Sequence, residues 1–172
     1  MTVFDCEPGL KSQPLAELKR AGRDFRLSIA GAGPDQGELM AATQAAGLLD
    51  RVEFLGSVFA AEKCRLWLNS DVFVFPTYQE GLPYSLLEAM AAGCVPITTP
   101  VAAIPDVMRD GEHGSFVPVK DAVALAAAIA GLDDDRERLI RMAKAARCRV
   151  LEQYTAARLA DDFRRLYERC LA

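Results

Sequence analysis

Two carboxylates bracket a short turn near the middle of the chain. Glu80 and Glu88 are the ends of the segment 80–88, which reads Glu-Gly-Leu-Pro-Tyr-Ser-Leu-Leu-Glu. Carboxylate oxygens accept hydrogen bonds from sugar hydroxyls, and backbone N–H groups at the start of a helix attract phosphate. If the turn opens a helix, the segment therefore has the chemistry needed to bind a nucleotide.

The flanking residues predict the elements that would position this segment. The apolar run Asp71–Pro76 directly upstream predicts a buried strand. A helix is predicted from the turn to about Ala92, with Gly93 as its C-cap. Strand, glycine turn and helix in this order form the arrangement in which α/β folds bind nucleotides.

Further strands and helices alternate along the chain. The sequence predicts strands at 25–30, 52–55, 95–98 and 116–119, and helices at about 35–47, 60–69 and 105–109. From residue 121 onward it predicts helices only, including one at 133–153 and a last one at 155–171 with an apolar stripe. This alternation is typical of an α/β fold with a parallel, doubly wound sheet, whose ligands bind beyond the carboxyl ends of the strands.

Several other residues allow a functional or a structural interpretation. Gly31 and Gly33 follow the strand 25–30, where they would contact a ligand or serve only as turn glycines, because Gly-x-Gly alone is a weak signal. His113, the single histidine, lies in a polar turn and is predicted to be at the surface, so a Ser-His-Asp site or a multi-histidine metal site has little support. Trp67 precedes a buried strand, and its predicted role is core packing.

Composition limits the classes of function. The 172 residues and the apolar fraction of 51% suit one globular domain, and the formal net charge of -4 argues against nucleic acid as a partner. No apolar run approaches the roughly 20 residues of a membrane-spanning helix, no secretory signal pattern opens the chain, and a peripheral membrane contact stays compatible with the sequence. The five cysteines lack metal-type spacing, which predicts reduced thiols in a cytoplasmic protein and no bound metal.

The segment 80–88 and its surroundings resemble a known family. The pair of glutamates is similar to the E-x7-E motif of retaining, nucleotide-sugar-dependent glycosyltransferases with the GT-B fold. The likeness follows the family's order and spacing from about residue 25 to residue 170. GT-B enzymes have two Rossmann-like domains with the active site between them, and this chain resembles only the C-terminal, donor-binding domain. The resemblance implies one Rossmann-like domain over 1–172, with the N-terminal acceptor domain absent.

The resemblance also implies roles for the matching residues. Glu80, as the catalytic carboxylate, would lie near the donor sugar and the reacting centre, and Glu88 would accept hydrogen bonds from the ribose hydroxyls. The residues whose backbone would face the sugar and the diphosphate are Gly81, Leu82, Pro83 and Tyr84. Gly31 and Gly33 would let the backbone approach the nucleotide, and residues 54–57 would lie beside the base. No cofactor is implied, since GT-B enzymes typically need no metal and the nucleoside diphosphate sugar is a substrate.

The chain departs from the family where the diphosphate would be clamped. The family usually has an Arg and then a Lys just after the first strand of this domain, and their charges stabilise the leaving group. Residues 1–19 contain no Arg, and Lys11 is the only basic residue near the expected place. Ala102 and Ala103 also stand where the family often has glycines.

The implied function is donor binding for glycosyl transfer from a nucleoside diphosphate sugar, with retention of anomeric configuration. Because the acceptor domain is absent, the isolated chain is expected to be inactive or weakly active, and its partner would be that domain or a separate chain. Two further functions stay open: a non-catalytic nucleotide-sugar-binding subunit that needs a partner chain, and a degenerate, non-catalytic domain. A nucleotide-sugar epimerase shares the fold but would show a different set of acids and histidine.

Overall fold

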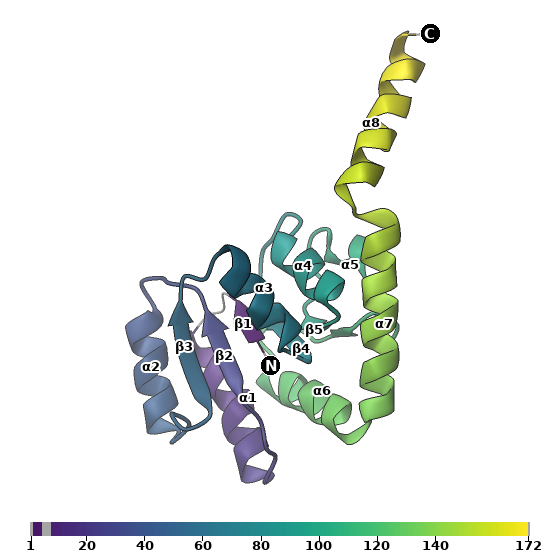
Figure 1. The fold of residues 1–172 in the computed structure, drawn as a ribbon. Coiled ribbons are helices and arrows are strands. Elements are labelled where there is room, and N and C mark those ends of the chain that lie inside the picture. Colours follow the sequence, from purple (N-terminus) through teal and green to yellow (C-terminus); the bar gives the residue numbers. More distant parts are fainter. Residues whose placement is uncertain (1, 5–7, 172) are drawn as a thin grey trace.

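The computed structural model describes residues 2–4 and 8–171, with side chains from residue 13 onward. A parallel sheet lies between two layers of helices (Figure 1). The strands are β1 (Thr2–Phe4), β2 (Leu27–Ala30), β3 (Val52–Gly56), β4 (Val72–Phe75), β5 (Val95–Thr98) and β6 (Ser115–Phe116). The helices are α1 (Pro8–Arg20), α2 (Gln36–Ala45), α3 (Ala60–Leu68), α4 (Tyr84–Ala92), α5 (Ile104–Val107), α6 (Ala122–Asp134), α7 (Arg136–Gln153) and α8 (Ala156–Leu171).

The sheet has the order β3-β2-β1-β4-β5-β6, and each pair of neighbouring strands is parallel. The chain builds one half of the sheet outward from β1 to β3, returns to place β4 beside β1, and builds the other half outward to β6. This arrangement confirms the predicted α/β class with a Rossmann-like parallel sheet flanked by helices. Strand β1 and helix α1 were not predicted, because β1 has only three residues and α1 contains Pro14, which weakens a helical pattern.

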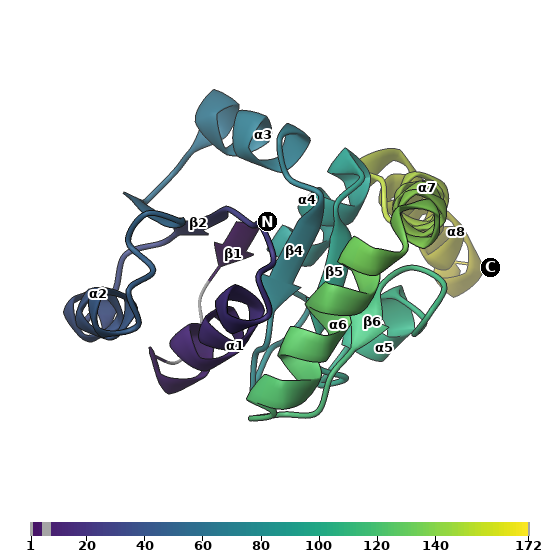
Figure 2. The same ribbon diagram turned by 90° about the horizontal axis from the view of Figure 1, so that it is seen from below.

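Strand β4 shows how the two faces of the sheet are filled. Successive side chains of a strand point to opposite faces, so Val72 and Val74 join one buried cluster and Phe73 and Phe75 join another. The first cluster includes residues of α1, α2 and α6, and the second includes residues of α3, α4 and α5. Figure 2 shows α1, α2 and α6 on one side of the strands and α3 on the other. Trp67, 3% exposed and edge-on to the Phe73 ring at 5.0 Å, has its predicted core role.

Helix α7 begins later than predicted. Asp133 and Asp134 are the last residues of α6, and Asp135 separates the two helices. The Asp135 carboxylate accepts a hydrogen bond from the backbone N–H of Arg138 at 2.8 Å, which makes Asp135 the N-cap of α7. The predicted helix start at Asp133 is therefore wrong, because a capping aspartate must precede the first helical residue.

The last two helices differ in their packing. Helix α7 contributes Leu139 and Met142 to the first buried cluster and Ala146 and Val150 to the second. Helix α8 projects away from the sheet (Figure 1), and none of its described residues is buried. The apolar stripe of α8 is therefore left open to solvent in this structure.

Candidate functional site

The sheet topology places the segment 80–88 at its switch point. Strands β1 and β4 are neighbours, but the chain continues from them toward opposite sides of the sheet. Ligands of such sheets bind beyond the carboxyl ends of the strands at this point. The loop after β4, residues 76–83, leads directly into α4, whereas the loop after β1 lies outside the described residues. Glu80 and the start of α4 therefore stand at the edge formed by the carboxyl ends of the strands, here called the carboxyl edge.

Threonine hydroxyls hold the loop that carries Glu80. Thr98 ends β5 and Thr99 follows it; both are fully buried, and their hydroxyls donate hydrogen bonds to the backbone carbonyls of Phe75 and Thr77, respectively. The Thr77 hydroxyl in turn lies 3.3 Å from Glu80 Oε1. These threonines were not predicted as site residues, although polar residues at the end of a buried strand are a usable signal. They link the position of the carboxylate to the adjacent strand.

Glu88 lies one turn inside α4 and contacts a neighbouring helix. Side chains of a helix tilt toward its N-terminus, so the Glu88 carboxylate leans over the first turn of α4. Its Oε2 atom is 2.5 Å from Nζ of Lys63 in α3, and the two side chains are 43% and 31% exposed. Sequence reasoning missed Lys63, because a single lysine on a helix gives no signal until α3 is placed beside α4.

The start of α4 lacks a side-chain cap. Pro83 is its N-cap residue and makes no side-chain capping hydrogen bond. The Leu86 N–H donates to the Pro83 carbonyl at 3.1 Å, and the N–H groups before it precede the first helical hydrogen bond. Helices α2, α3 and α5 also lack a side-chain cap, whereas Asp121 and Asp135 cap α6 and α7 with hydrogen bonds of 2.8 Å to backbone N–H groups. The start of α4 is thus available to an anion. Tyr84, its first residue, is 77% exposed and takes no part in the core.

Three non-glycine residues of the described chain have positive φ angles, and all follow carboxyl ends of strands. They are Ala60 (φ 45), Ala102 (φ 49) and Lys120 (φ 62), after β3, β5 and β6. This conformation costs about 1–2 kcal/mol for a residue with a Cβ atom, and such strain clusters at functional sites. Ala102 adopts the conformation that a glycine tolerates freely, which explains why a glycine suits this position.

The glycines of this edge border open space. Gly31 has φ 140, which a residue with a side chain rarely adopts, and its N–H donates to the Gly56 carbonyl at 2.7 Å. A Cβ atom added to Gly31, Gly33 or Gly81 would meet nothing within 4 Å. Gly31 is therefore required by its backbone conformation, and all three glycines leave room for a ligand to approach.

Two lysine side chains of the described chain, those of Lys63 and Lys120, lie at this edge, and the predicted role of Lys11 stays a prediction. Lys11 belongs to α1, and its side chain lies outside the described part of the structure. Besides Lys63, Lys120 reaches the loop after β4, with Nζ 5.1 Å from the centre of the Tyr78 ring. No group of three or more His, Cys, Asp or Glu side chains suited to a metal ion occurs within residues 2–4 and 8–171. No helix in the described part is both long and apolar enough to span a membrane.

His113 is buried, contrary to the prediction. It lies in the turn before β6 and is 5% exposed, and its Nδ1 atom accepts a hydrogen bond from the Arg109 N–H at 3.0 Å. The turn is pressed against β5, since a Cβ atom at Gly114 would be 2.4 Å from the Pro96 carbonyl oxygen. Burial lowers the pKa of His113 below its ordinary value of 6.5. Because β6 begins here, His113 lies at the amino end of the strand and away from the Glu80 loop.

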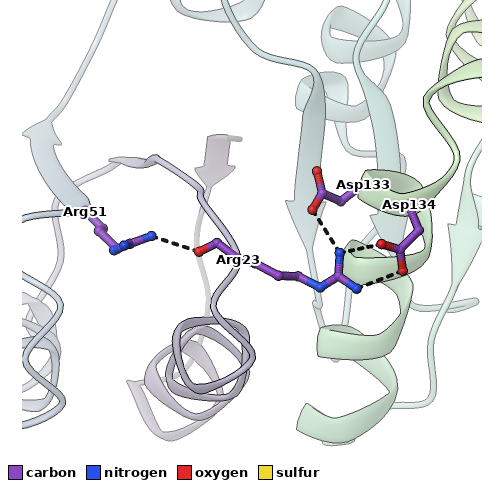
Figure 3. Close-up of polar contacts among 4 residues, drawn as sticks. All are labelled: Arg23, Arg51, Asp133 and Asp134. Atoms are coloured by element: carbon purple, nitrogen blue, oxygen red, sulfur yellow. Dashed lines mark hydrogen bonds and ion pairs between the residues drawn. The ribbon is translucent and has the colours of Figure 1, made fainter.

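A cavity of about 360 Å³ opens at the amino ends of the strands, here called the amino edge. Several of its charged lining residues form ion pairs. Arg23 contacts Asp133 at 2.9 Å and Asp134 at 2.7 Å, and its backbone carbonyl accepts a hydrogen bond from Arg51 at 2.9 Å (Figure 3). The hydrogen bonds from Arg23 hold the pKa of Asp134 below its usual range. The cavity is therefore separate from the two glutamates, and its ion pairs join α6 to the segment before β2.

Comparison with known proteins finds relatives that are longer than this chain. The sequence model of the family described as Glycosyl transferases group 1 matches residues 12–135. A phosphatidyl-myo-inositol mannosyltransferase of Mycobacterium leprae is 36% identical over 149 residues, which are 84% of this chain and 38% of the relative. A putative colanic acid biosynthesis glycosyltransferase of Salmonella typhimurium, WcaL, is 35% identical over 120 residues, which are 66% of this chain and 30% of the relative. The chain thus spans about a third of the length of these curated relatives.

Solved structures share the fold over nearly the whole chain. HepE of Anabaena, solved in complex with UDP, has a TM-score of 0.85 at 17% identity, and the match covers 97% of this chain and 48% of HepE. The C-terminal domain of LpcC, a glycosyl transferase group 1 family protein of Francisella tularensis, has a TM-score of 0.76 at 25% identity. That match covers 90% of this chain and 86% of the LpcC domain. The fold of this chain therefore corresponds to about half of the HepE chain and to most of the isolated LpcC domain.

Proposed function

Because this chain belongs to the glycosyl transferases group 1 family and has the GT-B type of Rossmann-like fold, we propose that it is the donor-binding, C-terminal domain of a glycosyltransferase. The observation that carries this proposal is the position of the segment 80–88. Its two carboxylates and the uncapped start of α4 lie together at the switch point of the sheet, where α/β proteins bind nucleotides.

Each part of a nucleoside diphosphate sugar has a matching group at this edge. The ribose hydroxyls donate hydrogen bonds to Glu88, whose carboxylate is partly open to solvent. The diphosphate binds at the start of α4, where N–H groups without helical partners and the helix dipole favour negative charge. The sugar lies beside Glu80, which is held by the Thr77 hydroxyl. Gly31, Gly33 and Gly81 allow the backbone to approach the ligand closely.

The proposed reaction moves the sugar to an acceptor hydroxyl with retention of configuration. The bond between the anomeric carbon and the diphosphate oxygen breaks, and a bond to the acceptor oxygen forms on the same face of the sugar. The acceptor proton leaves with the nucleoside diphosphate. The start of α4 stabilises the negative charge that grows on the leaving group, and the Glu80 carboxylate stabilises positive charge at the anomeric carbon. We propose that this chemistry uses no bound metal.

The acceptor site of this enzyme lies on a second domain. The relatives are longer than this chain, and the described part of the carboxyl edge is one side of a two-domain site in the GT-B fold. We expect the chain by itself to bind the donor and to transfer little sugar. The alternative is a nucleotide-sugar-binding subunit that works with a separate chain. A cytoplasmic location stays a prediction from the cysteine content.

Calorimetry tests the donor-binding role. UDP, GDP and ADP are titrated into the protein alongside the corresponding monophosphates. We expect at least one diphosphate to bind more tightly than its monophosphate, because the start of α4 offers a site for the second phosphate. Absence of binding by all three diphosphates at millimolar concentration would contradict the proposal. Adding the N-terminal domain of a relative and following product by mass spectrometry then distinguishes an enzyme domain from a binding subunit.

A further inference from the structure

The ammonium group of Lys63 lies against the carboxylate that the proposed function assigns to the ribose. Its Nζ atom is 2.5 Å from Glu88 Oε2, a contact that joins α3 to α4. Trp67, four residues after Lys63, is buried in one cluster with Leu86 and Met90 of α4. Residues four apart lie on one face of a helix, so the docking of Trp67 on α4 turns Lys63 to the same side. Core packing therefore sets the position of this ion pair.

Two features at the start of α3 are unfavourable for a helix, one in the backbone and one in the charge of Lys63. Ala60, the first residue of the helix, has φ 45, which residues with a Cβ atom rarely adopt. Lys63 also places a cation in the first turn of the helix, where the dipole favours anions. In natural proteins such local conflicts are concentrated at functional sites. The pair also differs from Arg158–Asp162, a typical surface pair within one helix, because it connects two elements at the carboxyl edge.

The Lys63–Glu88 pair leaves the carboxylate with capacity to accept hydrogen bonds from a diol. An ionised carboxylate offers about four lone-pair sites, and the ion pair with Lys63 is made through the Oε2 atom of Glu88. The side chain of Glu88 is 43% exposed, so the ion pair does not close it off from solvent. A carboxylate fixed on one side and open on the other can accept hydrogen bonds from two adjacent hydroxyls, whereas a freely rotating one must first be ordered at a cost in entropy.

We propose that Lys63 is a positioning residue for nucleotide recognition. Its ammonium holds Glu88 in the orientation in which the carboxylate accepts both ribose hydroxyls, and the Lys63–Glu88 pair thereby distinguishes ribose from 2′-deoxyribose. The proposal rests on the proposed function, and it adds the residue that directs Glu88. It extends the donor site to α3, an element that the two-glutamate motif does not include.

The test measures discrimination between the two sugars. Calorimetry compares the tightest-binding of UDP, GDP and ADP with its 2′-deoxy counterpart, in the parent protein and in Lys63→Met, Lys63→Arg and Lys144→Met. Lys144 is an exposed lysine of α7 and serves as the matched control. We expect Lys63→Met to weaken binding of the ribonucleotide about three- to tenfold, in the lower part of the range of coupling between neighbouring groups, and to change binding of the deoxy form little. Lys63→Arg should restore most of the discrimination, and Lys144→Met should match the parent.

The outcomes separate this inference from the function on which it rests. If the parent binds the nucleotides and Lys63→Met keeps the parent's ratio of ribose to deoxyribose affinity, the positioning role is wrong and the donor site stands. Tighter ribonucleotide binding by Lys63→Met would also overturn it, since Lys63 would then compete with the ligand. If the parent binds neither nucleotide, the donor site and the role of Lys63 both fail. Thermal unfolding of each variant verifies that the fold is intact, and Lys63→Gln replaces any variant that does not fold.

Discussion

The polar groups at the two edges of the sheet differ in whether they have partners within the protein. At the amino edge, Arg23 is paired with Asp133 and Asp134, and Arg136 contacts Asp71 at 3.2 Å, so these charged side chains already have partners. At the carboxyl edge, the start of α4 has no side-chain cap and three loops contain strained residues. The amino edge contains the cavity of about 360 Å³, whereas the carboxyl edge has a helix start without a side-chain cap. We therefore base the proposed donor site on the polar groups of the carboxyl edge and not on the cavity.

Replacing Glu88 should have the largest effect on binding. Glu88→Ala removes the acceptor for two ribose hydroxyls, and hydrogen bonds to a charged group contribute about 1.5–3 kcal/mol, so affinity for the nucleoside diphosphate should fall about tenfold or more. Asp71→Ala, which removes an exposed carboxylate of the amino edge, should leave affinity unchanged. Calorimetry measures both variants. An equal loss of nucleotide affinity in the two variants would contradict the assignment of the donor site to the carboxyl edge.

Stability should depend on pH through His113 at the amino end of β6. Burial lowers the pKa of this histidine in the folded state, and the cations of Arg149 and Arg109 act in the same direction, whereas Glu112 opposes them. The unfolded chain takes up a proton near pH 6.5 while the folded chain does not, so the free energy of unfolding should fall as pH decreases below about 6.5, by at most ~1.4 kcal/mol per pH unit. Above that pH neither state binds the proton, so His113 should cause no further change in the free energy of unfolding.

Urea unfolding between pH 7.5 and pH 5 checks this dependence. His113→Gln retains a hydrogen-bond acceptor for the Arg109 N–H but cannot titrate, so its stability should change less over this range. Its nucleotide affinity at pH 7.5 should equal that of the parent. The same pH dependence in the parent and in His113→Gln would assign the effect to other groups.

Breaking the Arg23 ion pairs should lower stability without affecting binding. Arg23→Met removes the contacts with Asp133 and Asp134, so the melting temperature should fall, by less at high salt because salt screens exposed charges. Arg141→Met serves as the control, since Arg141 contacts Glu137 at 3.8 Å within α7 and that pair is well exposed. Nucleotide affinity of both variants is measured by calorimetry. Weaker binding by Arg23→Met would show that the amino edge takes part in recognition.

Relieving backbone strain at Ala102 should have the smallest effect. Ala102→Gly removes the cost of a positive φ but adds conformational entropy to the unfolded chain, so the free energy of unfolding should rise by up to about 1 kcal/mol. Ala103→Gly is the matched control, because Ala103 has φ -83 and needs no glycine. Chemical denaturation of the two variants gives the comparison. A loss of stability in Ala102→Gly as large as that in Ala103→Gly would mean that no strain is stored at this position.

The sequence predicted the carboxyl edge better than the amino edge. The apolar run before Glu80, the glycine turn and the C-cap at Gly93 are local signals, and the structure contains the strand and helix that they predict. The resemblance to GT-B enzymes also indicated the family. The roles of Glu80 and Glu88 stay predictions, because nothing in the geometry alone identifies their ligand.

The missed features depend on contacts between distant residues. Lys63 meets Glu88 only after Trp67 has docked α3 on α4, and Arg23 is more than 100 positions from its partner Asp134. His113 was expected at the surface because its neighbours in sequence are polar, whereas its burial comes from β5. Local sequence patterns predict single helices and strands. Contacts between distant residues can be predicted only when the arrangement of these elements is known.

The most direct test of the account is to locate a bound nucleotide on the two edges. Amide resonances of the labelled protein are followed by NMR during titration with the diphosphate that binds most tightly. We predict that the largest shifts occur at residues 80–88 and at Gly31 and Gly33, with little change around Arg23 and Asp71. Shifts that concentrate around Arg23 and Asp71, with residues 80–88 unaffected, would contradict the assignment of the donor site to the carboxyl edge.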